Sequence, residues 1–296
     1  MEWLTEFPSM DKESLRALKK AIDGGFREFT RGYGESVELL FDPIKYFLIQ
    51  SEHFLTNTPW PIIMGLICLI SWIASRNFKI VIGTLITMVL IGYFNMWNDT
   101  MKTVSMTFVC TMLSVSMGIP IGIIMSRYNR LQRVITPILD VMQTMPSFVY
   151  LIPVVMLLGI GKVPGMLAVV IYAIPPIIRL TNLGIRLVDR DVLEAADAYG
   201  SSAWQRLRNV QIPLALPTIM TGINQTIMMA LSMVVVASMI GVQGLGQPVL
   251  KAIANQYFTL GVFNGLAIVG IAIIFDRVSQ AFGRRLQKHQ EIVHGN

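Results

Sequence analysis

The sequence predicts an all-α integral membrane protein with about seven transmembrane helices. Of its 296 residues, 53% are apolar and 14% are charged, whereas about a quarter of the residues in an ordinary soluble domain are charged. The mean hydropathy is +0.58, and apolar segments near the roughly 20 residues needed to cross a bilayer recur along the chain. Such a chain has too little polar surface to stay in solution, which excludes a secreted or cytosolic enzyme.

Residues 1–58 are amphipathic rather than spanning. Apolar residues recur at intervals of three or four over 15–29 and again over 37–48, which is typical of helices with one apolar face. The segment 32–34 (Gly-Tyr-Gly) interrupts this pattern, and Pro43 kinks or restarts the second stretch. We therefore predict a pair of amphipathic helices that lie on the bilayer surface or against the spanning helices.

Seven apolar segments follow this tail. They cover about residues 59–75, 79–96, 102–126, 137–160, 163–185, 212–241 and 258–282. The first two fall within residues 59–100 and form an accessory pair, and the other five fall within residues 101–282. Residues 283–296 form a tail that begins with a basic flank, which is typical of the end of a spanning segment.

The basic residues predict how the chain is oriented. Fourteen Lys and Arg fall at one set of segment ends and three at the other. The larger set is Arg76, Lys79, Arg127, Arg130, Arg133, Arg179, Arg186, Arg190, Arg206, Arg208, Arg277, Arg284, Arg285 and Lys288, and the smaller set is Lys102, Lys162 and Lys251. Because loops rich in Lys and Arg stay in the cytoplasm, the C-terminus is expected inside and the N-terminal tail outside. Basic residues in short gaps between apolar runs do not form a nucleic-acid-binding patch.

One loop on the cytoplasmic side, residues 186–211, is long enough to form a functional element. Residues 192–199 are rich in helix formers, and acidic residues lie towards the N-terminal end, where the helix dipole favours them. Gly200 suits the left-handed position that closes a helix, and a second short helix is predicted over 203–210. The alanines at 195–196 give the first helix a smooth face that another protein can approach closely.

This loop carries a motif: Glu-Ala-Ala, three residues, Gly, nine residues, and then apolar-x-apolar-Pro. Its residues are Glu194, Ala195, Ala196, Gly200, Val210, Ile212 and Pro213. The motif resembles the loop signature of binding-protein-dependent ABC importer permeases, in which Ile and Leu usually stand at the positions of Val210 and Ile212. Further segments resemble glycine betaine/proline betaine permeases, namely residues 140–153, 159–161, 174–181, 224–226, 230–240 and 244–246. The resemblance covers roughly residues 60–282.

The resemblance implies an ABC importer type I (MetI-like) permease core over residues 101–282, with the motif as the contact for an ATPase. It also implies two ATPase copies, a second permease copy in a homodimer, an extracytoplasmic solute-binding protein, and a place in the bacterial inner membrane. The chain has no Gly-x-x-x-x-Gly-Lys-Ser/Thr motif to hold phosphates. We therefore expect no cofactor and no catalytic residue in this chain, and ATP with Mg²⁺ is used by the ATPase. The expected solute is of the quaternary ammonium type, and the sequence leaves open glycine betaine, proline betaine, choline, carnitine and trimethylamine N-oxide.

Charged residues within the spans, namely Asp140, Arg179 and Asp276, lie near the cytoplasmic ends. The remaining polar side chains are neutral, and some of them are candidates for lining the translocation pathway. They are Gln143, Asn224, Gln225 and Ser232, joined by the aromatic residues Phe148 and Tyr150. A neutral lining suits a methylated cation or zwitterion that passes without being held, and an aromatic ring can face a quaternary ammonium group. The alternative is that the polar side chains form hydrogen bonds between helices and that the aromatic residues are interfacial anchors.

Two other classes of protein fit the sequence less well. A stand-alone secondary carrier for small zwitterions, the alternative function, needs ionisable groups within its spans. The three His lie at 53, 289 and 294, outside the spans. An integral-membrane enzyme needs a catalytic cluster at membrane depth, and three His with two Cys are too few for a zinc site.

Overall fold

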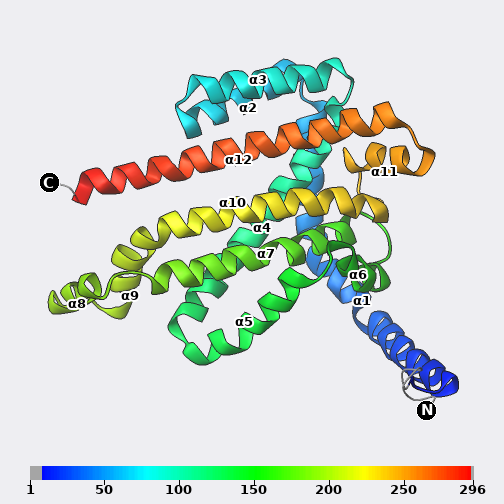
Figure 1. Ribbon diagram of the computed structural model, residues 1–296, viewed down its shortest axis with the longest axis horizontal. Helices are drawn as coiled ribbons and strands as arrows, with labels where there is room; N and C mark the ends of the chain where they lie inside the picture. Colours follow the sequence, from blue (N-terminus) through cyan, green and yellow to red (C-terminus); the bar gives the residue numbers. More distant parts are fainter. Residues whose placement is uncertain (1–8, 295–296) are drawn as a thin grey trace, which may run out of the picture.

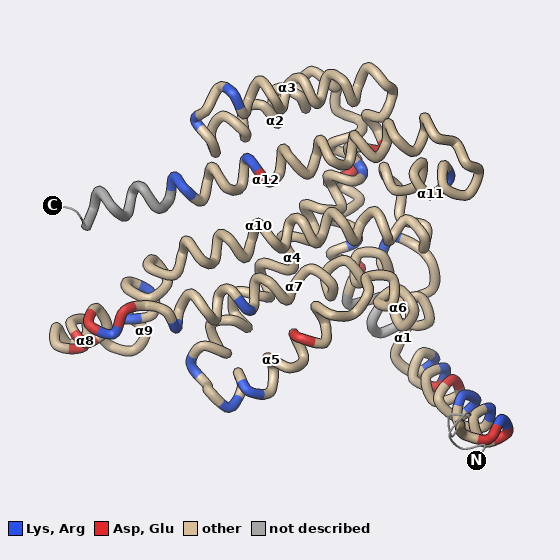
Figure 2. The backbone as a smooth tube through the Cα atoms, in the orientation of Figure 1, with Lys and Arg blue, Asp and Glu red and all other residues tan. Residues whose placement is uncertain are grey.

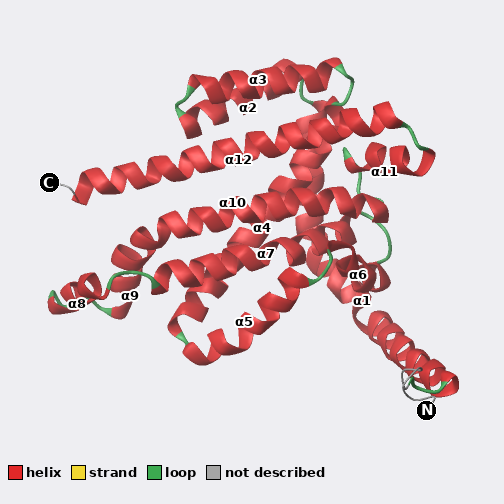
Figure 3. Cartoon of the chain, viewed as in Figure 1, coloured by secondary structure: helices red, strands yellow, loops and turns green. Residues whose placement is uncertain are grey.

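The structure is a bundle of helices with no strand in residues 9–294 (Figures 1 and 3). The computed structural model describes these residues, apart from the side chains of residues 35–38, 40 and 286–294. The outermost residues of the two predicted tails, 1–8 and 295–296, therefore lie outside the described part. In chain order the helices are α1 (Lys12–Asn57), α2 (Trp60–Ser75), α3 (Phe78–Tyr93), α4 (Trp97–Arg127), α5 (Asn129–Thr144), η2 (Ser147–Tyr150), α6 (Leu151–Leu158), α7 (Lys162–Arg186), α8 (Arg190–Ala198), α9 (Ala203–Arg206), η3 (Leu207–Gln211), α10 (Ile212–Ala237), η4 (Ser238–Ile240), α11 (Gly246–Asn255) and α12 (Phe258–His294).

Several of these helices are long and apolar enough to cross a membrane. Within the described residues four qualify alone, namely Trp97–Arg127, Lys162–Arg186, Ala203–Ile240 and Phe258–Arg285, and two bent pairs raise the number to six. The helix α3 is apolar but shorter, with 16 residues. In Figure 1, α2, α3, α4, α5 with α6, α7, α10 and α12 run alternately between the end that holds α11 and the end that holds α8. This arrangement agrees with the prediction of about seven spans.

The predicted fourth segment, 137–160, is not one straight span. The helix α5 begins earlier, at Asn129, and the chain turns by 112° between Thr144 and Ser147 before η2 and α6 continue. The cause is Pro146, because a residue that precedes proline is pushed out of the helical region. Met145 accordingly has extended backbone angles, with φ −68° and ψ 134°.

The N-terminal region also differs from its prediction. The expected break at 32–34 is absent, and α1 is one helix of 46 residues that continues through Gly32, Gly34 and Pro43. A glycine inside a helix costs only about 1 kcal/mol, which tertiary contacts readily offset. Gly34 lies where α1 passes close to α6, since a Cβ there would stand 3.1 Å from the Leu157 carbonyl oxygen.

The second half of α1 packs against the bundle, whereas its first half is largely exposed. Leu48 is buried in the same apolar cluster as residues of α4, α6, α7 and α10. The Glu52 carboxylate accepts a hydrogen bond of 2.7 Å from the Lys162 ammonium at the start of α7. The tail was predicted to lie either on the bilayer surface or against the spanning helices, and the second half of α1 lies against the spanning helices.

The helix α7 lies at the centre of the bundle, between α4 and α10 (Figure 1). Small residues let these helices approach closely, as in other membrane bundles. On α4, a Cβ at Gly122 would stand 2.7 Å from the Ile178 carbonyl oxygen of α7. On α10, a Cβ at Gly222 would stand 3.1 Å from the Leu180 Cβ of α7. The three helices form a tightly packed unit, to which α12 and the hairpin of α2 and α3 add further layers.

Candidate functional site

The loop between α7 and α10 folds into two short helices with well-formed ends. The Asp189 side chain accepts a hydrogen bond from the backbone N–H of Asp191 at the start of α8. Gly200 has φ +78°, the left-handed conformation predicted for it. Ser202 and Gln205 then form a capping box at the start of α9, which satisfies backbone donors at both positions. The predicted helices over 192–199 and 203–210 are thus confirmed as α8 and as α9 with η3.

One contact joins the two helices of this loop, and two others hold the loop to the bundle. The Arg206 guanidinium donates to the Asp197 carboxylate at 2.6 Å, which joins α9 to α8. The Arg127 guanidinium at the end of α4 donates to the Ala203 carbonyl at 3.0 Å. Leu207 is 2% exposed and packs into an apolar cluster with Met125 and other residues of α4, α5, α7 and α10. Sequence reasoning missed these contacts, and the one available signal was a single leucine between two arginines in a polar loop.

The outer surface of the loop has no partner within the described residues. The helix α8 buries none of its residues. Glu194 and Ala195 are exposed and Ala196 is half-buried. Tyr199 is 92% exposed and Trp204 is 64% exposed. Exposed aromatic side chains beside a small-residue face are typical of a protein–protein contact.

The last motif residues lie where the loop becomes α10. Val210 belongs to η3, a π-helical turn, and the Ile212 N–H donates to the Leu207 carbonyl, five residues earlier. Pro213 follows this turn, within the first turn of α10. α9, η3, α10 and η4 therefore continue as one helix of 38 residues, Ala203–Ile240. The seven motif residues are brought together at one end of the bundle.

The candidate pathway residues on α10 take different positions. Asn224 is half-buried, and its amide donates to the Asp276 carboxylate of α12 at 3.0 Å. It also accepts a hydrogen bond from the Ser279 hydroxyl, so this side chain bonds helix to helix. Gln225 and Ser232 are exposed, and their spacing of seven places them on one face of the helix. As pathway residues they remain predictions.

The candidates in the bent pair of α5 and α6 are likewise divided. Gln143 is exposed and Phe148 is 56% exposed. Tyr150 is buried, its ring meets that of Tyr172 edge to face at 5.6 Å, and its hydroxyl donates to the Met142 carbonyl. This geometry gives Tyr150 a packing role in the observed conformation and leaves the Phe148 ring accessible.

Comparison with known proteins agrees with this architecture. Residues 118–288 match the family described as binding-protein-dependent transport system inner membrane component. The chain is 46% identical over 242 residues to the glycine betaine/proline betaine transport system permease protein ProW of Escherichia coli (strain K12), covering 82% of this chain and 68% of that protein. It is 45% identical over 229 residues to the glycine betaine/carnitine transport permease protein GbuB of Listeria monocytogenes serotype 1/2a (strain 10403S), covering 77% of this chain and 81% of that protein.

A solved structure shares the fold. The chain is similar to an inward-facing structure of the MetNI methionine ABC transporter, with a TM-score of 0.57 and 20% identity, over 62% of this chain and 93% of that chain. The family match and the two permeases at 45% and 46% identity decide between the readings left open by the sequence, in favour of an importer subunit over a stand-alone carrier. The chain belongs to the binding-protein-dependent transport system inner membrane components, the membrane-spanning permease subunits of ABC importers, which act with an ATPase and a solute-binding protein.

Proposed function

We propose that this permease imports a compatible solute of the quaternary ammonium type across the bacterial inner membrane. The relatives support this solute class, because two of them are named as transport proteins for glycine betaine with proline betaine or carnitine. Each of these solutes carries a methylated cationic nitrogen together with a carboxylate. The exposed α10 face with Gln225 and Ser232 offers a neutral polar surface, which suits passage of a zwitterion without tight binding.

The observation that carries the proposed coupling mechanism is the exposed but firmly held surface of α8. Leu207 and the Arg127 contact hold the loop to α4 and α7 from the inside, and the pair of Arg206 with Asp197 holds α8 to α9. The outside, with Glu194 and Ala195, remains open. A partner that binds this surface can move the spanning helices, because the loop is attached to the bundle and does not move independently of it.

In this mechanism two permease copies pair with two ATPase subunits, and ATP with Mg²⁺ is bound and hydrolysed by the ATPases alone. Closure of the ATPase pair draws the two α8 surfaces together. The spanning helices then tilt as rigid bodies between inward-facing and outward-facing arrangements. The external binding protein delivers the solute to the outward-facing state.

The distribution of charge supports an orientation with the α8 end in the cytoplasm. Figure 2 shows Lys and Arg at the ends of α2, α4 and α12 and in the α8–α9 region, on the same side of the bundle. The start of α1 lies on the opposite side (Figure 1). Since basic loops stay in the cytoplasm, the N-terminal tail is proposed to lie outside and the C-terminal end of α12 inside.

The coupling surface is tested by Ala195→Trp. Helical periodicity places Ala195 on the side of α8 opposite Leu193 and Asp197, and it is exposed, so the larger side chain leaves the permease fold intact and blocks close approach. The matched control is Ala254→Trp, an exposed alanine on α11 at the other end of the bundle. We expect A195W to lose co-purification with the ATPase and ATP-dependent uptake in proteoliposomes. Wild-type ATPase binding by A195W, or equal loss in A254W, contradicts the proposed contact.

The solute class is tested separately in proteoliposomes that contain permease, ATPase and binding protein. Uptake of radiolabelled glycine betaine, proline betaine, carnitine, choline and trimethylamine N-oxide is compared with uptake of methionine and proline, which lack a methylated cationic nitrogen. We expect ATP-dependent accumulation of at least one methylated solute. Accumulation of methionine or proline alone contradicts the solute class and leaves the proposed coupling surface unaffected.

A further inference from the structure

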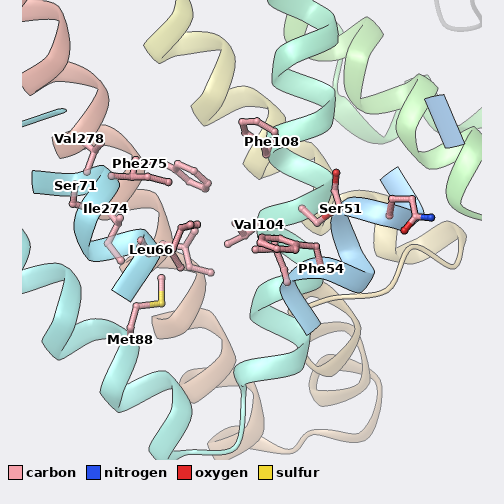
Figure 4. Close-up of a pocket in the computed structure, with 16 residues that line it drawn as sticks. Ser51, Phe54, Leu66, Ser71, Met88, Val104, Phe108, Ile274, Phe275 and Val278 are labelled. Atoms are coloured by element: carbon pink, nitrogen blue, oxygen red, sulfur yellow. The ribbon is translucent and has the colours of Figure 1, made fainter. Parts of the chain in front are cut away.

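A large apolar cavity lies between the core of the bundle and the hairpin of α2 and α3. It has a volume of about 520 Å³, and its walls come from α1, α2, α3, α4 and α12. Figure 4 shows Phe275 and Val278 of α12 on one side and Phe108 of α4 on the other. Phe54 and Leu66, which also line it, are 52% and 37% exposed. The cavity therefore opens to the outside of the bundle, beside helices that are long and apolar enough to span a membrane.

A second pocket follows one helical turn farther along α2 and α12. Its volume is about 400 Å³, and three arginines line it: Arg76, Arg284 and Arg285. On α12 the apolar cavity ends at Val278 and the basic pocket starts at Ala281, a rise of about 4.5 Å. The two pockets thus follow one another along α2 and α12, and we treat them together as one groove with an apolar part and a cationic end.

Among the side chains that the structure describes, the arginines in this pocket have no acidic partner, since none of the ion pairs involves Arg76, Arg284 or Arg285. The single carboxylate on the described part of α12 belongs to Asp276, which accepts hydrogen bonds from Asn224 of α10 and from Gln280. The Arg285 guanidinium donates to the Ile73 carbonyl at 2.6 Å, which holds the pocket together at the end of α2.

We propose that this groove binds one anionic phospholipid, with its phosphate among the three arginines and an acyl chain in the apolar cavity. A planar guanidinium pairs with phosphate through parallel hydrogen bonds, and basic pockets between spanning helices suit anionic headgroups. An acyl chain is the apolar group available at bilayer depth. The bound lipid joins the α2–α3 hairpin to α12 and α4. The site depends on neither the solute nor the ATPase contact, so it does not rest on the proposed function.

Native mass spectrometry of the full chain, released from detergent micelles, tests the headgroup. Palmitoyl-oleoyl phosphatidylglycerol is titrated against the phosphatidylethanolamine with the same chains. The variant Arg76→Gln with Arg284→Gln removes two cations and retains the structural Arg285. Since each removed cation weakens binding about fivefold, we expect about 25-fold weaker phosphatidylglycerol binding. The control, Arg130→Gln with Arg133→Gln, removes the same charge from exposed positions on α5 and is expected to bind like wild type.

The apolar part is tested by Leu66→Trp, which fills the mouth of the cavity without changing charge. Leu69→Trp is the control, because Leu69 lies on the same helix, is 55% exposed and does not line the cavity. We expect L66W alone to lose bound phosphatidylglycerol, and inorganic phosphate not to displace the lipid from wild type. The proposal is overturned if the two lipids bind equally well or if R76Q/R284Q binds phosphatidylglycerol like wild type. It is also overturned if phosphate displaces the lipid and L66W has no effect. The last result indicates a simple anion site.

Discussion

Replacing Gly122 by alanine probes the contact between α4 and α7, on which the core depends. The added Cβ would stand 2.7 Å from the Ile178 carbonyl oxygen and 2.7 Å from the Thr181 Cβ. Carbon atoms prefer separations of about 3.5–4.0 Å. Because the carbonyl belongs to the backbone of α7, no side-chain rotation relieves the clash, and the helices must move apart by about 1 Å.

The expected magnitude is the balance of two effects. Overpacking of this kind costs about 1–3 kcal/mol, whereas glycine to alanine inside a helix gains about 1 kcal/mol. The matched control is Gly65→Ala on α2, where an added Cβ meets nothing within 4 Å. G65A therefore gains the higher helix propensity of alanine without a steric clash. The free energies of unfolding of G122A and G65A should therefore differ by about 1–3 kcal/mol.

Unfolding by increasing SDS in mixed micelles, followed by tryptophan fluorescence of the five Trp, measures this difference. Gly118→Ala gives a second test, because its added Cβ would meet the Ile177 Cγ2 at 2.3 Å, and this methyl belongs to a fully buried side chain with one preferred rotamer in a helix. Both G118A and G122A are expected to be less stable than G65A. Equal stability of G122A and G65A would refute the close-contact argument.

Two further predictions concern other contacts of the core. Leu207→Ala should lower the free energy of unfolding by about 2–5 kcal/mol, because it leaves a cavity in the apolar cluster. It should also loosen the loop, so limited trypsin digestion should cut faster within residues 186–211. The control Leu214→Ala, at an exposed position, should leave the cleavage rate unchanged. Glu52→Gln leaves the partly buried Lys162 without its counter-charge and should destabilise by about 1–3 kcal/mol in the SDS assay. The control is Asp42→Asn, at an exposed position, which should lower the free energy of unfolding by less than about 1 kcal/mol. An equal loss of stability in the two variants would contradict a special role for the partly buried pair of Glu52 and Lys162.

The sequence predicted well the features that depend on local chemistry. Gly200 adopts the left-handed conformation expected at a helix end, and the helices on either side of it follow from composition and capping. The alternation of apolar segments with basic gaps also led to the right membrane class. These signals are local, since each depends on a few neighbouring residues or on an average over a segment.

The features that the sequence did not predict depend on contacts between distant segments or on the direction in which the chain continues after a turn. Hydropathy is an average and carries no direction, so 137–160 resembled one span although Pro146 turns the chain by 112°. Gly34 was taken as part of a helix break, whereas it provides room for α1 to pass the Leu157 carbonyl. The bond from Arg127 to the Ala203 carbonyl joins residues 76 positions apart, and no sequence pattern pairs them.

The unbroken helix Ala203–Ile240 has a mechanical consequence for the two faces of the membrane. At 38 residues it is about 57 Å long, so it is a single rod whose ends lie in different compartments. Its far end is fixed to the loop before α7, where the Gly161 N–H donates to the Ile240 carbonyl at 3.1 Å. In the proposed coupling, a displacement of α9 is therefore carried along this helix to Ile240 and to the start of α7. One continuous helix can thus connect the two ends of the bundle, without a relay of side chains.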